Sequence, residues 1–268
     1  DELRGRFRIA AFFTLMTCAY FLGGAVVLRM DMLMVLFITL SLWTFWRIYQ
    51  GDGSLRLRIA FPLYVFMAIF SKGPVGIMVP LICIPAYLLI VKDFRKIGKI
   101  WGWSTWLILA VLCGLWWWGV YAEGGTPYLN NLLFHQTAGR AVNAFHHKRH
   151  WYYYLYTVWY AMGPWSLLTI PVAAWAAVRK SSLSALTKFF LIISAVFFIM
   201  MSAVSSKLAI YLLPCFGLFN YAAFIILQQA DDGTRRWPSA VRKTVFALAG
   251  AIFIAAVVIG FFFPGIFK

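Results

Sequence analysis

The chain has 268 residues, of which 63% are hydrophobic and only 12% are charged. A soluble globular domain carries about 25% charged residues, so the composition excludes an ordinary soluble protein. The net charge of +16 is high enough for a nucleic-acid-binding protein. However, the basic residues stand in short clusters between apolar runs, which is typical of membrane-protein loops. We therefore expect membrane lipids as partners and no nucleic acid.

Nine continuous apolar runs predict transmembrane helices, because each is about long enough to cross a bilayer and none alternates like a barrel strand. The sequence thus predicts an all-α, polytopic helical bundle that forms one domain over residues 1–268. The third run is short and is interrupted by Pro62. The predicted spans are 9–28, 32–49, 57–71, 74–91, 101–121, 152–178, 188–204, 208–229 and 244–263.

Lysine and arginine residues predict how these spans are oriented. Seventeen of the 24 fall in alternate loops, and the basic-rich side is cytoplasmic by the positive-inside rule. The opposite side then holds one longer loop, 122–151, and three short connections at 29–31, 71–74 and 205–207. The alternation continues through all nine spans, so it supports their number as well as their orientation.

Each short outer connection carries a cation at the edge of a span, namely Arg29, Lys72 or Lys207. Charges near the apolar region are costly and mark a site when they do not snorkel to the membrane surface. Snorkelling is the alternative for any one of them. Together with Arg140 of the longer loop, they would hold an anion such as a phosphate.

Carboxylates are rare on the outer side, where only Asp31 and Glu123 fall. If this face performs acid–base chemistry with carboxylates, Asp31 is the first candidate. An anion also suits the N-terminus of the helix that begins there, so Asp31 has a purely structural alternative as a helix cap.

The longer outer loop holds all four histidines: His135, His146, His147 and His150. Histidine changes charge near neutral pH and is a common metal ligand, so this concentration indicates a functional loop. An ordinary interfacial connector is the alternative. His147 and His150 would share one helix face and form a possible metal pair, although carboxylate or cysteine partners are not evident nearby.

Aromatic residues are also dense on the outer side. They form either an interfacial aromatic belt or a platform for a sugar ring or an isoprenoid tail, for which Tyr153 is a candidate. The residues are Trp116, Trp117, Trp118, Tyr121, Tyr128, Trp151, Tyr152, Tyr153, Tyr154, Tyr156, Trp159 and Tyr160.

Five short motifs, in order over about 190 residues, resemble those of the integral-membrane glycosyltransferases related to protein O-mannosyltransferases and to the lipid A aminoarabinose transferase. They are Arg-Met-Asp-Met-Leu (29–33); Ser-Lys-Gly-Pro-Val (71–75); Trp116-Trp117-Trp118 with Asn-Asn-Leu-Leu-Phe-His-Gln (130–136) and Arg140; His147-Lys148 with Trp-Tyr-Tyr-Tyr-Leu (151–155) and Gly163-Pro164-Trp165; and Ser206-Lys207 through Tyr211-Leu212-Leu213-Pro214.

This resemblance implies a C-type glycosyltransferase fold, a sugar donor carried on a polyprenyl phosphate, and inverting transfer at the outer face of the inner, or plasma, membrane. It implies that Lys72, Lys207, Tyr211 and Arg140 lie near the lipid phosphate, where Arg29 would join them. It also implies that Asp31 and His147 lie near the reacting centre or a bound divalent cation.

The sequence departs from the family pattern at several positions. His150 stands where the family usually has Pro, and Asn130, Asn131 and Gln136 occupy a region where many members have Glu. The family's presumed catalytic Asp precedes the equivalent of the first span. We therefore expect the chain to be a fragment that lacks N-terminal spans and the general base, and to be inactive by itself.

The sequence thus predicts transfer of a sugar from a polyprenyl-phosphate donor to a hydroxyl or phosphate of an acceptor, which would be lipid A, another glycolipid or a protein. Two alternatives stay open. The same cations would serve a transporter or flippase for an anionic lipid-linked sugar, and the outer loop would serve a non-catalytic membrane scaffold.

Overall fold

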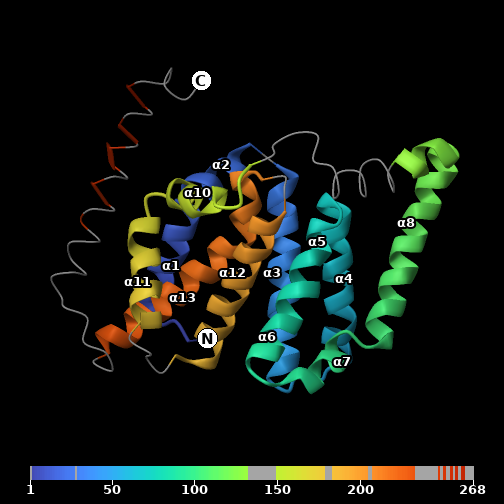
Figure 1. The fold of residues 1–268 in the computed structure, drawn as a ribbon, viewed down its shortest axis with the longest axis horizontal. Coiled ribbons are helices and arrows are strands. Elements are labelled where there is room, and N and C mark those ends of the chain that lie inside the picture. The colour runs from blue at the N-terminus through green and yellow to red at the C-terminus, as the bar shows by residue number, and fades with distance from the viewer. Residues whose placement is uncertain are drawn as a thin grey trace. The chain divides into compact units, whose positions relative to one another are not determined.

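The structure is a computed structural model that describes residues 2–27, 29–131, 149–178, 183–204 and 207–232, with scattered positions between 247 and 262. All regular secondary structure in these ranges is helical (Figure 1), so the predicted all-α fold class is confirmed. The elements are α1 (Gly5–Met16), α2 (Ala19–Val26), α3 (Met30–Tyr49), α4 (Leu55–Lys72), α5 (Val75–Met78), the π-helix η1 (Val79–Cys83), α6 (Ile84–Ile90), the 3₁₀-helix η2 (Phe94–Lys96), α7 (Ile97–Ile100), α8 (Trp103–Asn130), α10 (Tyr153–Ala161), α11 (Ser166–Val178), α12 (Ala185–Ala203), the 3₁₀-helix η4 (Ala209–Leu212) and α13 (Leu213–Asp231).

Several of these helices are long and apolar enough to cross a membrane. Four pass by length and composition: α3, α8, α12, and η4 together with α13. The pair α1 and α2 is a fifth candidate if the bent pair counts as one span. The chain is therefore a multi-pass membrane protein. The count of nine spans stays a prediction, and most of the last predicted span, 244–263, lies outside the described residues.

The chain divides into two compact units. The first comprises Asp1–Val26, Tyr154–Ser194 and Cys215–Lys268, and the second comprises Val27–Tyr153 and Ala195–Pro214. In the first unit, Leu168 and Val172 of α11 pack with Ala11 of α1 and with Phe224 and Ile226 of α13. This packing buries one apolar stripe of each helix, as expected for a helical bundle.

A polar bridge crosses the first unit between α1 and α13. The Asn220 side chain donates from Nδ2 to the Ala11 carbonyl over 2.7 Å, and Thr14 Oγ1 donates to Asn220 Oδ1 over 3.1 Å. Both side chains are buried. Such interhelical hydrogen bonds contribute roughly 0.6 kcal/mol each in membrane bundles, so the bridge fixes which faces meet more than it adds stability.

Two predicted spans in the first unit are broken rather than continuous. The span predicted at 9–28 consists of α1 and α2, which are bent by 63° to each other. The span predicted at 152–178 consists of α10 and α11, separated by a turn that contains Gly163 and Pro164. Proline cannot donate a backbone hydrogen bond and disfavours helical geometry in the residue before it, which accounts for the second break.

The two breaks bond to each other. The backbone N–H of Ala19 donates to the Gly163 carbonyl over 2.9 Å, and Trp165 Nε1 donates to Thr17 Oγ1 over 2.7 Å. A helix end leaves backbone groups without intrahelical partners, and lipid offers none. The Ala19–Gly163 bond therefore satisfies one backbone group at each break, and the Trp165–Thr17 bond joins side chains beside it.

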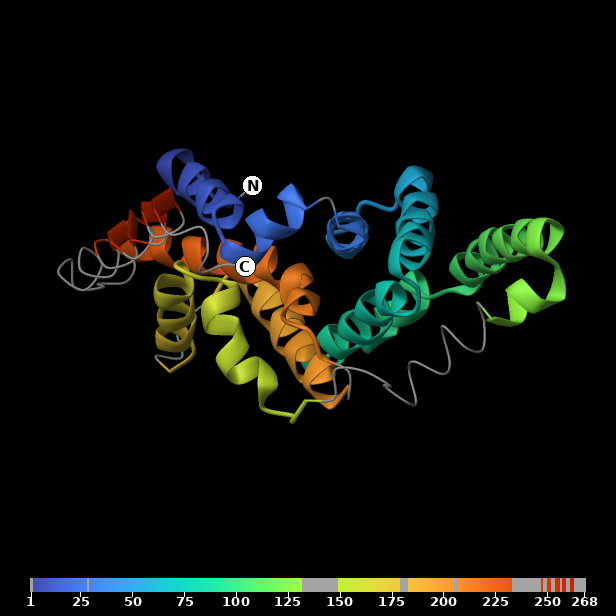
Figure 2. The same cartoon turned by 90° about the horizontal axis from the view of Figure 1, so that it is seen from above.

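In the second unit, α4 packs against α3, α5 and α8. The predicted third span, 57–71, is the 18-residue helix α4, which continues through Pro62. The predicted outer loop, 122–151, begins as helix because α8 extends to Asn130. At Gly125 the backbone leaves helical geometry with a φ of +64°, and Figures 1 and 2 show α8 bending sharply near this end.

Gly76 allows α5 to approach α4 closely. A Cβ atom at this position would overlap the Ala68 carbonyl and lie 2.6 Å from the Ile69 backbone nitrogen. Because backbone atoms cannot rotate away as a side chain can, the two helices would have to separate. The contact lies close to Lys72, the last residue of α4.

We expect Gly76→Ala to lower the free energy of unfolding by about 1–3 kcal/mol through overpacking. The better helix propensity of alanine offsets only part of this loss, about 1 kcal/mol at most. Thermal unfolding in detergent measures the effect. Gly114→Ala in α8 is the matched control, because no atom lies within 4 Å of its added Cβ. Equal melting temperatures for the two variants would contradict the close approach.

Candidate functional site

The candidate site lies in the second unit, where the N-terminus of α3 meets the C-terminus of α4. Arg29 caps α3 with an extended backbone, at φ −79° and ψ 142°, and Asp31 lies in the first turn. An anion is favoured there because the helix dipole places partial positive charge at the N-terminus. Lys72 ends α4, where the helix dipole favours a cation in the same way.

Asp31 pairs with two cations. Its Oδ2 lies 3.3 Å from Arg29 Nε, and its Oδ1 forms an ion pair and hydrogen bond with Lys72 Nζ. Asp31 is 1% exposed, whereas half of the Arg29 side chain is exposed. A buried carboxylate requires such partners, and here it brings two positive side chains together.

The chain turns sharply just after Lys72. Gly73 has a φ of +74° and a ψ of −147°, a conformation that only glycine adopts readily. The turn returns the chain to α5 within two residues, so it keeps Lys72 at the end of α4.

Tyr211 of η4 completes this group. Lys72 Nζ lies 4.8 Å from the centre of the Tyr211 ring, within the range of a cation–π interaction. We call Arg29, Asp31, Lys72, Lys207 and Tyr211 the Asp31 cluster. Lys207 is included because the sequence predicts it in the same anion site and because it lies four residues before Tyr211.

Lys207 is 3% exposed. Its Nζ donates to the Arg149 carbonyl over 3.3 Å and also to the Val204 carbonyl. Within the described residues no carboxylate lies within 4.0 Å of it. Burial lowers the pKa of Lys207 from its ordinary value. Burial disfavours the charged amine, and the carbonyl partners do not neutralise it, so an anionic ligand would supply the counter-charge that it lacks among the described residues.

The Asp31 cluster therefore has three cations and one carboxylate. A group with this surplus, at the end of apolar helices, is suited to hold a phosphate at a membrane face. Its three cations come one each from the short outer connections predicted at 29–31, 71–74 and 205–207, and Arg140, the fourth cation of the predicted anion site, lies outside the described residues.

Other predicted residues are placed less fully. Arg140 and His147 lie outside the described residues. His150 is exposed and stacks on Tyr152 with ring centres 5.2 Å apart, and Tyr153 is the half-buried first residue of α10. Among the residues that the structure describes, no group of three or more His, Cys, Asp or Glu is arranged to hold a metal ion. The metal pair of His147 and His150 stays a prediction.

The Lys207 contacts could not be found from the sequence. The carbonyls of Arg149 and Val204 accept from its Nζ, and any residue has such a carbonyl. Nothing in the amino-acid types identifies these two.

The comparison with protein-family models found no match, and neither did the comparison with curated proteins. Two solved structures of ArnT from Cupriavidus metallidurans do match. The chain is 19% identical to ArnT bound to undecaprenyl phosphate, with a TM-score of 0.74 over 94% of this chain and 44% of that one. It is 20% identical to the apo state, with a TM-score of 0.63 over 85% and 40%. The chain thus spans less than half the length of these proteins, and it shares the fold of the matching part of ArnT, as the resemblance predicts.

Proposed function

We propose that this chain forms the donor-binding part of an integral-membrane glycosyltransferase. The donor would be a sugar on a polyprenyl phosphate, and the acceptor a hydroxyl or phosphate of a lipid or protein. Two findings support this: the cationic surplus of the Asp31 cluster, and a fold shared with ArnT bound to undecaprenyl phosphate. The positive-inside rule favours a periplasmic or extracellular site in an inner, or plasma, membrane.

The Asp31 cluster carries the proposal because of the chemistry at a lipid phosphate. An acceptor oxygen attacks the anomeric carbon, the bond from that carbon to the phosphate oxygen breaks, and polyprenyl phosphate leaves with the bonding electron pair. The acceptor proton passes to a base. Negative charge grows on the phosphate, so fixed cations stabilise the transition state, which is often the largest catalytic contribution.

The geometry supports a positioning role for Asp31 beside its predicted catalytic role. The carboxylate contacts Arg29 and Lys72 directly, and without it two like charges would repel each other at close range. Asp31 would therefore hold both cations where one phosphate can contact them. For Arg140 and His147, which lie outside the described residues, the roles at the phosphate and at the reacting centre stay predictions.

Asp31→Asn tests the function and the role together. Membranes that contain the full-length protein would receive radiolabelled sugar on polyprenyl phosphate, and release of polyprenyl phosphate and sugar transfer would both be followed. We expect release coupled to transfer in the wild type. We expect Asp31→Asn to raise the donor KM about tenfold, because the cations lose the group that orders them. Glu123→Gln, at the other predicted outer carboxylate, is the control.

Each contrary result has a definite meaning. A fall in kcat of about 100-fold or more with an unchanged KM would assign Asp31 to proton transfer rather than positioning. If the wild type released no polyprenyl phosphate with any donor, the glycosyltransferase proposal would be wrong. Labelled donor crossing the bilayer unchanged would instead establish the transporter alternative.

A further inference from the structure

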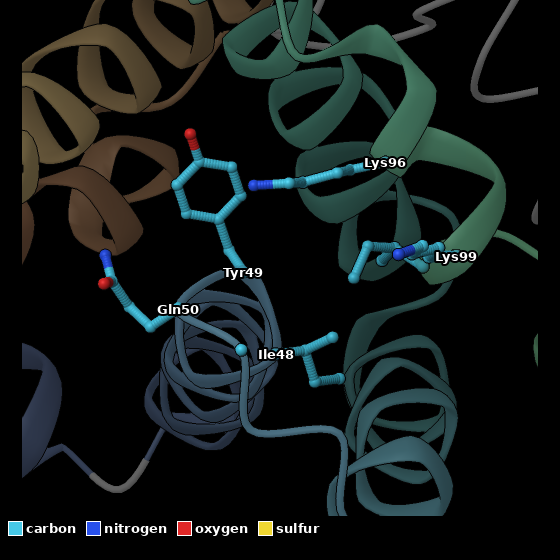
Figure 3. Close-up of a pocket in the computed structure, with 7 residues that line it drawn as sticks. Ile48, Tyr49, Gln50, Lys96 and Lys99 are labelled. Atoms are coloured by element: carbon cyan, nitrogen blue, oxygen red, sulfur yellow. The ribbon is translucent and has the colours of Figure 1, made fainter.

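A second group of charged residues lies at the opposite end of α3. Twenty helical residues span about 30 Å, the thickness of the hydrocarbon core, so Tyr49 lies at the other membrane face from Asp31. A pocket of about 330 Å³ opens there. Its lining residues come from the end of α3 and from η2 and α7: Ile48, Tyr49, Gln50, Gly51, Lys96, Lys99 and Ile100. Figure 3 shows Lys96 extending toward the Tyr49 ring, with Lys99 nearby.

The pocket wall is held by a network around Asp93. Tyr49 donates its hydroxyl to Asp93 Oδ2 over 2.6 Å, and Lys96 Nζ lies 3.4 Å from the same oxygen. The Tyr49 hydrogen bond and Lys96 lower the pKa of Asp93, so it is ionised at neutral pH. Lys96 Nζ also lies 4.1 Å from the centre of the Tyr49 ring. These contacts fix one lysine against an aromatic wall.

Lys99 leaves the pocket with a surplus of positive charge. Asp93 balances Lys96, but within the described ranges no carboxylate lies within 4.0 Å of Lys99. The positive-inside rule accounts for basic residues in this loop. It does not require two of them to line a cavity beside an ordered tyrosine ring.

Exposed apolar side chains precede the pocket-lining lysines in the sequence. Leu89 and Ile90 end α6, and Phe94 begins η2, and all three are more than half exposed. Exposed apolar groups next to cations at a membrane face suit a ligand that has both acyl chains and a negative head group.

We propose that this pocket binds the phosphate of an anionic phospholipid. Lys99 would supply the unbalanced charge, Lys96 a second contact, and the Tyr49 ring a flat wall for the head group. The volume is adequate for a small head group. The site is separate from the Asp31 cluster, so this proposal does not depend on the proposed transferase activity.

Native mass spectrometry of the detergent-purified full-length protein, titrated with phosphatidylglycerol, tests this. We expect phosphatidylglycerol to bind and phosphatidylcholine to bind at least tenfold more weakly. We expect Lys96→Gln/Lys99→Gln to weaken phosphatidylglycerol binding about 25-fold, since each lysine near anionic lipid contributes roughly fivefold. Arg95→Gln is the matched control, because it removes one charge directly before Lys96, at an exposed residue that does not line the pocket.

Lys99→Gln alone keeps the proposal testable if the double variant misfolds. Lys99 takes no part in the Asp93 network, so its replacement leaves the contacts of that network intact. We expect it to weaken phosphatidylglycerol binding about fivefold with an unchanged melting temperature. If Arg95→Gln weakened phosphatidylglycerol binding equally, the effect would come from general surface charge, and the proposed binding site in the pocket would be wrong. Displacement of the lipid by millimolar inorganic phosphate would overturn the assignment to a phospholipid in favour of a free anion.

Discussion

Lys207→Met is expected to reduce sugar transfer by about 100-fold or more without destabilising the protein. The side chain is buried, and within the part of the chain that the structure describes its Nζ bonds only to carbonyls. Methionine has a similar length and no charge, and replacing a buried charge with an apolar residue is often neutral or stabilising. Activity is measured in membranes with labelled sugar on polyprenyl phosphate, and stability by thermal unfolding in detergent.

The control for this prediction is Lys188→Met, which makes the same chemical change near the start of α12, where the lysine is exposed. It should leave both transfer and melting temperature unchanged. If Lys207→Met retained transfer within about threefold, Lys207 would not contact the leaving phosphate. Loss of activity together with a large fall in melting temperature would make the residue structural instead.

The lowered pKa of Lys207 also predicts how sugar transfer and stability depend on pH. Burial lowers its pKa below the ordinary 10.5, so its charge is lost at a lower pH than that of an exposed lysine. The wild-type kcat/KM for the donor should therefore fall as pH rises through this lowered pKa. The pH profile of Lys207→Met should lack this decrease at high pH. Stability changes in the opposite direction. The unfolded chain binds more protons, so stability rises with pH between the folded pKa and 10.5.

Lys72→Met is expected to lower the free energy of unfolding by about 3 kcal/mol, in contrast to the same change at Lys207. The reason is Asp31, which is buried and would lose one of its two ion-pair partners. Arg29 remains 3.3 Å away, which keeps the loss at the lower end for a broken buried pair. Chemical unfolding in detergent measures the effect, and sugar transfer should also be impaired.

A double-mutant cycle separates the pair from other contributions of Lys72. Asp31→Asn/Lys72→Met removes both charges, so its stability should recover most of the loss seen in Lys72→Met. Transfer should stay impaired, because the cation that faces the phosphate is still missing. A double variant as unstable as Lys72→Met would mean that packing of the lysine stem, not the ion pair, stabilises this end of α4.

Hydropathy and charge predicted much of the fold. The span predicted at 32–49 agrees with α3 at Met30–Tyr49 because charged and polar residues bound an uninterrupted apolar run. The same reasoning joined 9–28 and 152–178 into single spans. Hydropathy averages over a window, so it does not detect a turn whose polar backbone is satisfied by another segment, as Ala19 is by Gly163. Gly163-Pro164 was the available signal for the second break.

Residue types predicted members of the candidate site, but they did not predict the contacts between them. Cations at three short connections identified Arg29, Lys72 and Lys207, since charge at the edge of a span needs an explanation. The ion pair between Asp31 and Lys72 joins residues 41 positions apart, and no periodicity encodes that meeting. The pocket at Tyr49 was missed because its lysines resemble ordinary cytoplasmic charges, and the Tyr49–Asp93 bond spans 44 positions.

The placement of Arg29 two residues before Asp31 has a consequence for how the protein is made. Lys72 follows Asp31 by 41 residues and ends α4, so α3 would enter the membrane ahead of the helix that carries this counter-ion. Arg29 is already present at the same helix end and within 3.3 Å of the carboxylate. The hydroxyls of Thr39, Ser41 and Thr44 also bond to carbonyls of their own helix. Helix α3 can thus enter lipid with its polar groups satisfied, and α4 adds Lys72 when it follows.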